Sequence, residues 1–255
     1  MKIWYNIPRV MHRLLVESAT LDMDCANLPK ESSAHLRVLR PKDGEEFELF
    51  DGCGSMRIYQ WRAAEKSLVA SPDSLRSTLP PPERKTTLFA CVTKGQRWDW
   101  TLQKATELGA SRIVPVVSER TIVRISPGEG AAKKLRWRKI CEEAARQSDA
   151  VWLPEIDEPM DLAAALGEAA KTTCFAGALT VPPPEPLLAA VQRAVKRDAP
   201  GAEFSVFNGP EGDFTPAELR ALLGVATPTS FGPTILRAET AAIYALSVLA
   251  AALAK

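Results

Sequence analysis

Apolar and polar residues alternate along residues 46–61, and Asp51 and Gly52 lie at the centre of this stretch. Alternation with a period of two is typical of strands that are buried on one face, and an Asp-Gly pair favours a tight turn between two such strands. We therefore predict a β-hairpin here, and short strands throughout the first part of the chain.

A proline-rich stretch then interrupts the alternation. Residues 71–85 contain Pro72 and the triple proline Pro80, Pro81 and Pro82, a composition that favours an extended linker over packed structure. We therefore predict a β domain at residues 1–72, a linker at residues 73–85 and a second domain at residues 86–255.

In this second part, short apolar runs alternate with segments of helical periodicity. The runs 87–92, 112–117 and 204–207 are typical of buried strands. Two of the segments between them place apolar residues on one face of a helix. Those faces consist of Trp98, Leu102, Ala105 and Leu108, and of Leu187, Leu188, Val191 and Val195. The alternation of strands and helices predicts an α/β domain.

The composition fits a folded protein without a strong overall charge. With 255 residues, of which 46% are hydrophobic, the chain can bury a full core, and its net charge is +1. A balance of this kind does not attract nucleic acid or membrane as a whole, so any basic surface must be local. The densest basic cluster is 133–139, with five basic residues around Trp137. Both a phosphate-contacting strip and a solvated helix face fit this cluster.

Cysteine and histidine usage predicts a reduced protein without a metal. The five cysteines are far apart and include no C-x-x-C pair, and the two histidines have no second ligand at metal-binding spacing. We therefore expect free thiols, no metal and a cytoplasmic location. The thiols are Cys25, Cys53, Cys91, Cys141 and Cys174.

The residue patterns near the two ends of the sequence do not indicate a membrane-associated segment. Arginines interrupt the apolar residues at the amino terminus, which is unlike a signal peptide. The longest apolar stretch, 241–254, is shorter than the roughly 20 residues of a membrane span and is expected to form a buried helix. Because a monomer would cover so apolar a helix poorly, we expect a homodimer.

A glycine-rich loop, 208–213, follows the predicted strand 204–207 and precedes a helix start with Thr215, Pro216 and Glu218 in the order of a capping box. Open α/β sheets bind ligands at the carboxyl ends of their strands, where glycines allow the backbone to approach a ligand closely. The same residues also fit an ordinary tight turn, and the pattern alone leaves both interpretations open.

A second loop, 231–237, leads into the apolar helix at the carboxyl end of the chain. Arg237 and Glu239 stand at the start of that helix, where charged groups need partners. They could form a local ion pair or line the mouth of a pocket. The chain contains no G-x-G-x-x-G, P-loop or G-x-S-x-G motif, so we expect a protein that works by holding two reactants together.

Four segments, at 94–121, 136–148, 208–219 and 231–242, resemble in order the motifs of the 16S ribosomal RNA uridine N3-methyltransferase family, part of the SPOUT superfamily. Residues 7–10 and 34–52 are similar to that family's PUA-like β-barrel. The resemblance implies an amino-terminal PUA-like β-barrel that helps to bind RNA, followed by a SPOUT α/β domain with a carboxyl-terminal trefoil knot.

The resemblance also implies a cofactor, S-adenosylmethionine, and a substrate, 16S rRNA within the 30S subunit, for a homodimeric enzyme. Methyl transfer to uracil N3 requires alignment of two reactants and removal of one proton from an unpaired base. The implied catalytic residues are Arg237 and Glu239. The implied cofactor-binding residues are Asn208, Gly209, Pro210, Glu211, Gly212, Phe231, Gly232, Ile235, Leu236, Arg237 and Thr240. The implied RNA-binding residues are Arg9, Arg37, Arg40, Lys94, Arg97, Gln103, Lys104, Arg136 and Arg138.

Four positions depart from the family pattern. Ala150 and Thr234 stand where arginine is usual, Arg146 reverses a charge, and Asp213 stands where a second glycine is usual. Two other hypotheses therefore stay open, a catalytically silent RNA-binding member of the same fold and a methyltransferase of tRNA ribose. The residues leave the target nucleotide, the proton acceptor and the choice between free rRNA and assembled subunits undecided.

Overall fold

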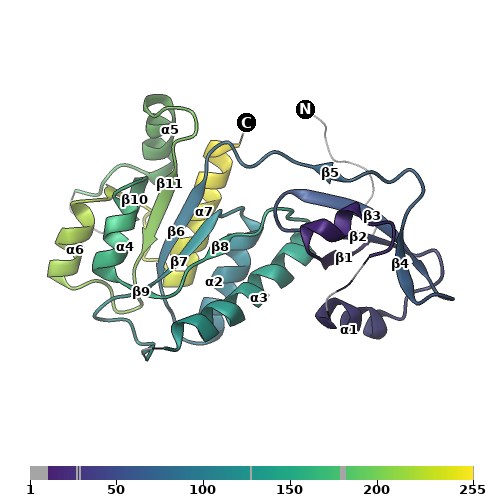
Figure 1. Ribbon diagram of the computed structural model, residues 1–255. Coiled ribbons are helices and arrows are strands. Elements are labelled where there is room, and N and C mark those ends of the chain that lie inside the picture. The colour runs from purple at the N-terminus through teal and green to yellow at the C-terminus, as the bar shows by residue number, and fades with distance from the viewer. Residues whose placement is uncertain (1–10, 27, 29, 127, 179–181, 255) are drawn as a thin grey trace. The chain divides into compact units, whose positions relative to one another are not determined.

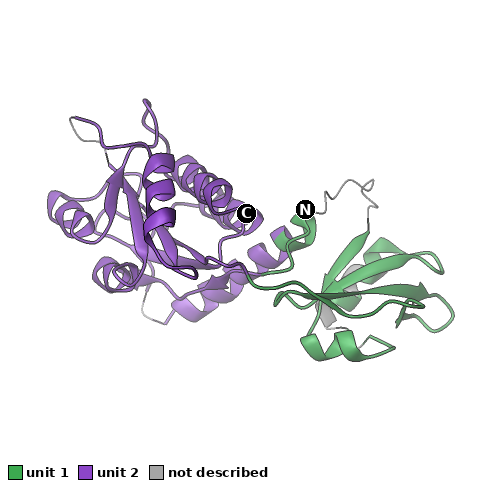
Figure 2. Cartoon of the chain, turned by 90° about the horizontal axis from the view of Figure 1, so that it is seen from above, with its two compact units in different colours: residues 1–81, 145–152 green, residues 82–144, 153–255 purple. Residues whose placement is uncertain are grey.

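The computed structural model describes residues 11–26, 28, 30–126, 128–178 and 182–254. The chain forms two compact units, which are coloured separately in Figure 2. The first unit comprises Met1–Pro81 and Ala145–Trp152, and the second comprises Pro82–Ala144 and Leu153–Lys255.

The first unit is built on a small mixed sheet. Its strands run in the order β1-β2-β3-β4, with β5 paired to β3, and only the β1–β2 pair is parallel. The strands are β1 (His12–Leu15), β2 (Glu46–Phe50), β3 (Ser55–Arg62), β4 (Ser67–Ala70) and β5 (Ser77–Thr78), accompanied by the 3-10 helix η1 (Ser18–Asp22) and by α1 (Lys30–Leu39).

The predicted hairpin is confirmed as β2 and β3, joined by a loop at 51–54. The Asp51 carboxylate accepts hydrogen bonds from the backbone N–H groups of Cys53, at 2.8 Å, and Ser55, at 3.0 Å, which folds the turn. Phe47, Leu49 and Tyr59 project inward from the two strands and are fully buried. The alternation in the sequence therefore records one buried face of the sheet.

The first unit also includes chain that lies outside residues 1–72. Strand β5 lies within the stretch predicted as a linker, and residues 145–152 come from the end of α3 (Gly130–Ser148) and the segment after it. Arg13 of β1 holds this segment. Its guanidinium donates to the carbonyl oxygens of Ala145, at 2.6 Å, and Ala150, at 3.3 Å, and pairs with Glu48 at 2.7 Å.

The second unit is a parallel α/β domain, as predicted. Its sheet has the strand order β12-β10-β11-β6-β7-β8, with β9 also paired to β7, and all of these pairs are parallel. The strands are β6 (Thr86–Cys91), β7 (Arg112–Val117), β8 (Glu155–Ile156), β9 (Met160–Asp161), β10 (Thr173–Gly177), β11 (Phe204–Asn208) and β12 (Thr227–Thr229).

Helices cover both faces of this sheet (Figure 1). On one face, α2, α3, α5 and α7 bury apolar side chains against Leu88 and Val206, and on the other, α4 and α6 pack against Phe89 and Phe207. Adjacent residues of β6 and β11 therefore serve two cores, which explains their continuous apolar runs. The bounds of the helices are α2 (Gln96–Glu107), α4 (Leu162–Ala169), α5 (Leu187–Arg197), α6 (Pro216–Leu223) and α7 (Ala238–Leu253).

Three local predictions can be compared directly with the structure. The capping box at Thr215 and Glu218 is confirmed at the start of α6. Leu188, predicted on the inner face of its helix, is 44% exposed, because the buried face of α5 is centred on Leu187, Ala190, Val191 and Ala194 and leaves Leu188 at its margin. Trp137 is buried against Trp98, with ring centroids 5.5 Å apart, so this tryptophan belongs to the core and not to a phosphate-contacting surface.

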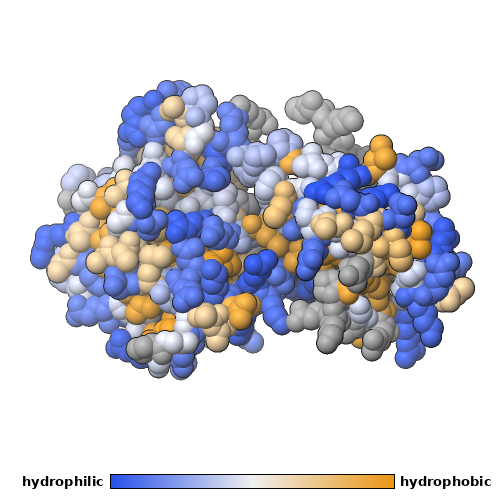
Figure 3. Space-filling model, viewed as in Figure 1, coloured by the Kyte–Doolittle hydropathy of each residue, from blue (hydrophilic) through white to orange (hydrophobic). Residues whose placement is uncertain are grey.

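The surface seen in Figure 3 intersperses hydrophobic residues among hydrophilic ones on both units. Among the described residues, no helix has the length and apolar character that crossing a membrane requires. Helix α7, predicted from its apolar composition to be buried, packs Ala242, Leu246 and Leu249 into the core of the second unit.

Candidate functional site

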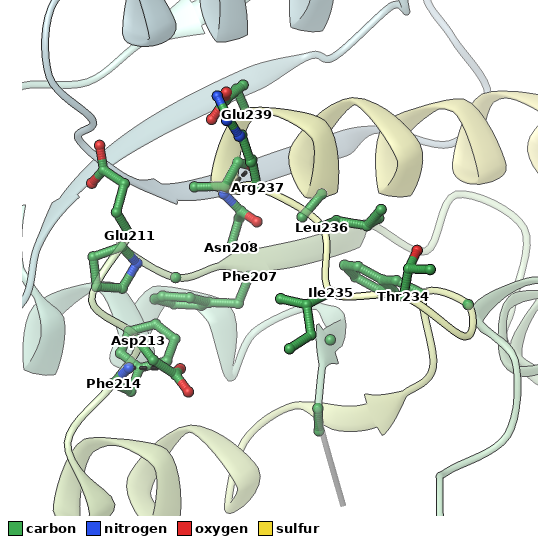
Figure 4. Close-up of a pocket in the computed structure, with 18 of the residues that line it drawn as sticks. Phe207, Asn208, Glu211, Asp213, Phe214, Thr234, Ile235, Leu236, Arg237 and Glu239 are labelled. Atoms are coloured by element: carbon green, nitrogen blue, oxygen red, sulfur yellow. Dashed lines mark hydrogen bonds between the residues drawn. The ribbon is translucent and has the colours of Figure 1, made fainter.

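A cavity of about 490 Å³ lies in the second unit at the carboxyl ends of β10, β11 and β12. Residues from three stretches of chain, 177–178, 207–214 and 230–241, line it together with Arg97 of α2 and Leu219 of α6. Figure 4 shows the side chains that these stretches present to the cavity. Because neighbouring parallel strands end at the same edge of a sheet, loops that are distant in the sequence meet here.

The loop that follows β11 is attached to the start of α7. The buried side chain of Asn208 donates from Nδ2 to the carbonyl oxygen of Ala238 at 2.9 Å. A Cβ atom at Gly209 would lie 3.0 Å from the Phe214 ring, so a larger residue would have to displace that ring. Both residues therefore fix the path of the loop along the cavity.

Asp213 gives this loop its bend. Its φ of 59° lies in the left-handed region, which favours glycine but is also accessible to aspartate. The Asp213 backbone donates to the Pro210 carbonyl at 3.0 Å, and its carboxylate accepts from the Phe214 N–H at 2.7 Å. The departure from glycine is thus accommodated by a local hydrogen bond.

Arg120, which the sequence reasoning missed, holds the outer side of the same loop. Its guanidinium donates to the carbonyl oxygen of Gly212 at 3.1 Å, and the neighbouring Glu119 N–H donates to Glu218 at 2.8 Å. A usable signal existed, because charged residues follow directly after the apolar strand β7, at the ligand-binding edge of the sheet.

The loop that follows β12 passes beside the segment before α5. The Ser230 N–H donates to the Glu185 carbonyl at 2.8 Å, and the Leu187 N–H donates to the Ser230 carbonyl at 3.1 Å. The ring of Phe231 then lies over Gly177, where a Cβ atom would approach it to 2.9 Å. Glycine at position 177 therefore leaves room for this ring beside the cavity.

Glu239 places a buried carboxylate at the cavity. It lies in the first turn of α7, where the helix dipole favours negative charge, and only 7% of it is exposed. Its Oε2 atom has no hydrogen-bond partner in the structure. Of the two interpretations of Arg237 and Glu239, the lining of a pocket agrees with their positions, and no ion pair joins these two described residues.

Glu211 also lines the cavity and, like Glu239, has a buried carboxylate oxygen. Its Oε1 atom lies 3.4 Å from both the backbone nitrogen of Lys94 and Nη1 of Arg97, while its buried Oε2 atom has no hydrogen-bond partner. A buried carboxylate oxygen without a hydrogen-bond partner is energetically costly. Glu211 and Glu239 are therefore positions at which a hydrogen-bond donor on a ligand would be favourable.

Most of the residues expected at the cofactor lie around this one cavity. Of the described residues so predicted, Gly212 and Thr240 do not line it. Gly177, Ala178 and Phe214 line it without having been predicted, and Arg97 lines it although it was expected to contact RNA. The predicted residues that line the cavity are Asn208, Gly209, Pro210, Glu211, Phe231, Gly232, Ile235, Leu236, Arg237 and Glu239.

The residues expected to contact RNA are spread over the two units. Arg9 and the side chain of Arg37 lie outside the described part, and Arg40 is an exposed residue of the first unit. In the second unit, Lys94 is exposed, Gln103 is half-buried, and the remaining predicted cations pair with carboxylates. Those pairs are Arg97 with Glu211, Lys104 with Glu107, Arg136 with Asp99, and Arg138 with Glu142.

The fold and the cavity define an α/β protein with a pocket between the loops at the carboxyl edge of a parallel sheet. Among the described residues, no group of three or more His, Cys, Asp or Glu side chains is placed to hold a metal ion. The chain belongs to the RNA methyltransferase domain family, whose model matches residues 80–250. The family membership expected from the sequence motifs is thereby confirmed.

Individual relatives agree with this assignment. Over 224 residues the chain is 32% identical to the ribosomal RNA small subunit methyltransferase E of Synechocystis, which covers 85% of this chain and 69% of the relative. The structure of a methyltransferase of Legionella pneumophila with bound S-adenosylmethionine matches at a TM-score of 0.78 and 28% identity, covering 96% of this chain and 98% of the other.

A third relative is named for its rRNA substrate and was solved with the cofactor bound. The ribosomal RNA small subunit methyltransferase E of Neisseria gonorrhoeae, solved with S-adenosyl methionine, matches at a TM-score of 0.76 and 26% identity and covers 94% of this chain and 96% of the other. The mixed α/β architecture, with a small amino-terminal sheet and a parallel α/β domain, is therefore shared with these structures.

Proposed function

We propose that this chain is an enzyme that transfers a methyl group from S-adenosylmethionine to N3 of a uridine in 16S rRNA. The observation that carries the proposal is the single cavity lined by the two glycine-containing loops, with the buried Glu239 at its wall. It rests further on membership of the RNA methyltransferase family and on the small-subunit rRNA named for the relatives.

The cavity fits a cofactor of this kind. Its volume lies within the range of about 300–1,000 Å³ that is typical of small-molecule sites. Gly209 and Gly232 expose backbone along it, Phe207 and Phe231 offer apolar surface, and Glu239 offers an acceptor for donors on the ligand. S-adenosylmethionine would supply an electrophilic methyl carbon on a positively charged sulfur, to which the carboxylates of Glu239 and Glu211 are complementary in charge.

The protein's task in such a transfer is alignment and management of one proton. The loops at 208–213 and 230–237 would fix the donor, and Arg237, an exposed residue at the cavity, would stabilise negative charge on a uracil oxygen as N3 loses its proton. Glu211 and Glu239 both line the cavity, and each has a buried carboxylate oxygen without a hydrogen-bond partner, so they are our two candidates for the proton acceptor.

The finer architecture belongs to the same proposal. We infer a trefoil knot at the carboxyl end, a PUA-like barrel in the first unit, domains at 1–72 and 86–255 joined by 73–85, and a homodimer. The passage of Ser230 beside Glu185 and Leu187, far from it in sequence, supports a threaded arrangement of these loops. The place of action would be the cytoplasm, where bacterial small-subunit rRNA is assembled into the 30S subunit.

Incubation with labelled S-adenosylmethionine and undermethylated 30S subunits tests the function, with free 16S rRNA and tRNA in parallel reactions. We expect label in small-subunit rRNA, located on uracil N3 by mass spectrometry of digested RNA. Label on a ribose of tRNA would support the ribose methyltransferase, and absence of label from every RNA would support the silent RNA-binding protein.

Glu239→Gln and Glu211→Gln separate the two candidate bases, because each removes a carboxylate while keeping its shape. The variant that lacks the base should transfer methyl groups more slowly by about 100-fold or more. Its affinity for S-adenosylmethionine, measured by calorimetry, shows whether the loss lies in binding instead. Equal rates in both variants and in the wild type would exclude both carboxylates as the acceptor.

A further inference from the structure

Helix α2 has an exposed tryptophan, Trp100, that does not line the cavity proposed for the cofactor. Trp100 is 48% exposed, whereas Trp98 in the same helix is 2% exposed. Trp100 borders a second, more open hollow of about 500 Å³, which is lined by Gln96, Arg97, Asp99, Trp100 and Gln103. Trp100 therefore offers part of its aromatic face to solvent beside polar side chains.

We propose that this hollow binds an unpaired nucleotide of the RNA substrate, with the base stacked on Trp100. The proposal deepens the function proposed above and rests on it. The nucleotide would be a neighbour of the target uridine, because Arg97 lines both this hollow and the cofactor cavity.

The side chains of the hollow match the chemistry of an unstacked base. Positions 96, 100 and 103 lie on one side of a helix, so Gln96 and Gln103 flank the indole from the preceding and following turns. Glutamine amides both donate and accept, as the hydrogen-bonding edge of a base requires. Single-stranded RNA is commonly bound by this combination of an aromatic face, polar side chains and a nearby arginine.

The helix that presents Trp100 is firmly placed. Trp98 packs edge to face against Trp137 of α3 with ring centroids 5.5 Å apart, and Asp99 pairs with Arg136 of the same helix at 2.5 Å. The residues on either side of the hollow are thus held by the core. Asp99 borders the hollow, and its Oδ1 atom is buried without a hydrogen-bond partner among the described residues.

The same hollow is poorly suited to contact with a second copy of the chain. Four of its five lining side chains are polar, and two of these, Arg97 and Asp99, are charged. Cores of protein–protein interfaces are depleted of charged residues, whereas RNA-binding surfaces combine aromatic faces with polar side chains. RNA is therefore the occupant that this surface favours.

Trp100→Ala and Trp100→Phe test the proposal by binding to a fluorescein-labelled decauridylate and to free 16S rRNA, measured by anisotropy and filter retention. Removal of one stacking platform should weaken binding to both RNAs by roughly 5- to 100-fold, and phenylalanine should restore most of it. With 30S subunits, the alanine variant should raise KM more than it lowers kcat. Leu188→Ala, which removes a similarly exposed apolar side chain from α5, should bind RNA as the wild type does.

Calorimetry with S-adenosylmethionine separates this proposal from the function on which it rests. Normal cofactor affinity with weakened RNA binding in Trp100→Ala supports the stacking site, even if no RNA accepts a methyl group from the wild type. RNA affinity within twofold of the wild type would overturn the site while leaving the methyltransferase intact. A change of mass in light scattering would assign Trp100 to contact between copies and would also overturn the proposal.

Discussion

Arg13 offers a stability test whose size follows from its contacts within the first unit. The side chain is 4% exposed, its guanidinium pairs with Glu48, and its face lies 4.3 Å from the centroid of the Phe50 ring. The same guanidinium donates to two carbonyl oxygens, of Ala145 and Ala150, from a segment more than 130 residues away in the sequence. It thereby fastens the end of α3 to the sheet.

The expected loss can be worked out for Arg13→Met, which keeps the apolar stem beside Phe50 and removes the charge. Breaking a buried ion pair by removing one partner costs about 3–5 kcal/mol, because the remaining charge stays desolvated. Glu48 is 21% exposed and can recover some hydration, so we expect the lower end, about 3 kcal/mol. Because the methionine side chain retains the packing beside Phe50, little further destabilisation from a cavity should be added to this loss.

Hydrogen exchange followed by mass spectrometry measures this loss locally, in peptides that cover β2 and β3. A loss of about 3 kcal/mol corresponds to exchange that is roughly 100-fold faster in the most protected amides. The double variant Arg13→Met, Glu48→Leu removes both charges and should recover most of the protection. Unchanged exchange in the single variant, or no recovery in the double variant, would refute this account of Arg13.

Four other predictions concern the cavity and the thiols. Gly209→Val should lower the affinity for S-adenosylmethionine by about tenfold or more, because its Cβ would press on Phe214 and move the loop; normal calorimetric binding would contradict this. Arg237→Ala should reduce methyl transfer by about 100-fold without shifting the thermal midpoint, since the side chain is exposed; unchanged turnover would remove it from the site. Burial raises the pKa of the Cys91 thiol to about 12 and that of the Cys141 and Cys174 thiols to about 11, so only the exposed Cys25 and Cys53 should react with a thiol reagent at pH 8. These buried thiols have a higher pKa in the folded than in the unfolded state. Their contribution to the free energy of unfolding should therefore be complete below pH 9 and be lost as the pH rises toward 12. Urea unfolding at a series of pH values would detect this decline.

Hydrophobic periodicity predicted many of the helices and strands, because burial of one or both faces of an element is visible as a pattern of apolar residues close together in the sequence. The hairpin at β2 and β3, the strands β6, β7 and β11 and the capping box of α6 all follow from residues within a few positions of one another. The short strands β8, β9 and β12 have two or three residues, too few to show a period, and they form because a longer strand offers its edge.

Properties that depend on distant partners could not be predicted in the same way. The sequence around Trp137 is strongly basic, yet this ring packs on Trp98, which no local pattern indicates. The extent of the first unit similarly depends on Arg13 reaching residues 145–150. At the cavity, the two loops were recognisable from glycine and charge, but Gly177, Ala178 and Arg97 join it only through the strand order of the sheet.

Two of the four departures from the family pattern have a local structural account. Asp213 adopts a left-handed conformation, which favours glycine, and accepts a hydrogen bond from the Phe214 N–H with its own carboxylate. Arg146, in the last turn of α3, suits the negative end of that helix dipole. Ala150 contacts Arg13 through its backbone carbonyl oxygen, which does not explain the absence of an arginine side chain at this position.

Thr234 is different, because it lines the cavity itself and is exposed. A threonine here removes a positive charge, relative to arginine, from the edge at which a polyanionic RNA would meet a cationic methyl donor. Arg237 then stands three residues away as a cation on the same loop. Since opposing charges act over roughly 8–10 Å at physiological salt, Arg237 can still serve a nucleotide bound at that edge. The balance between activity and silence in this chain should therefore depend on Arg237.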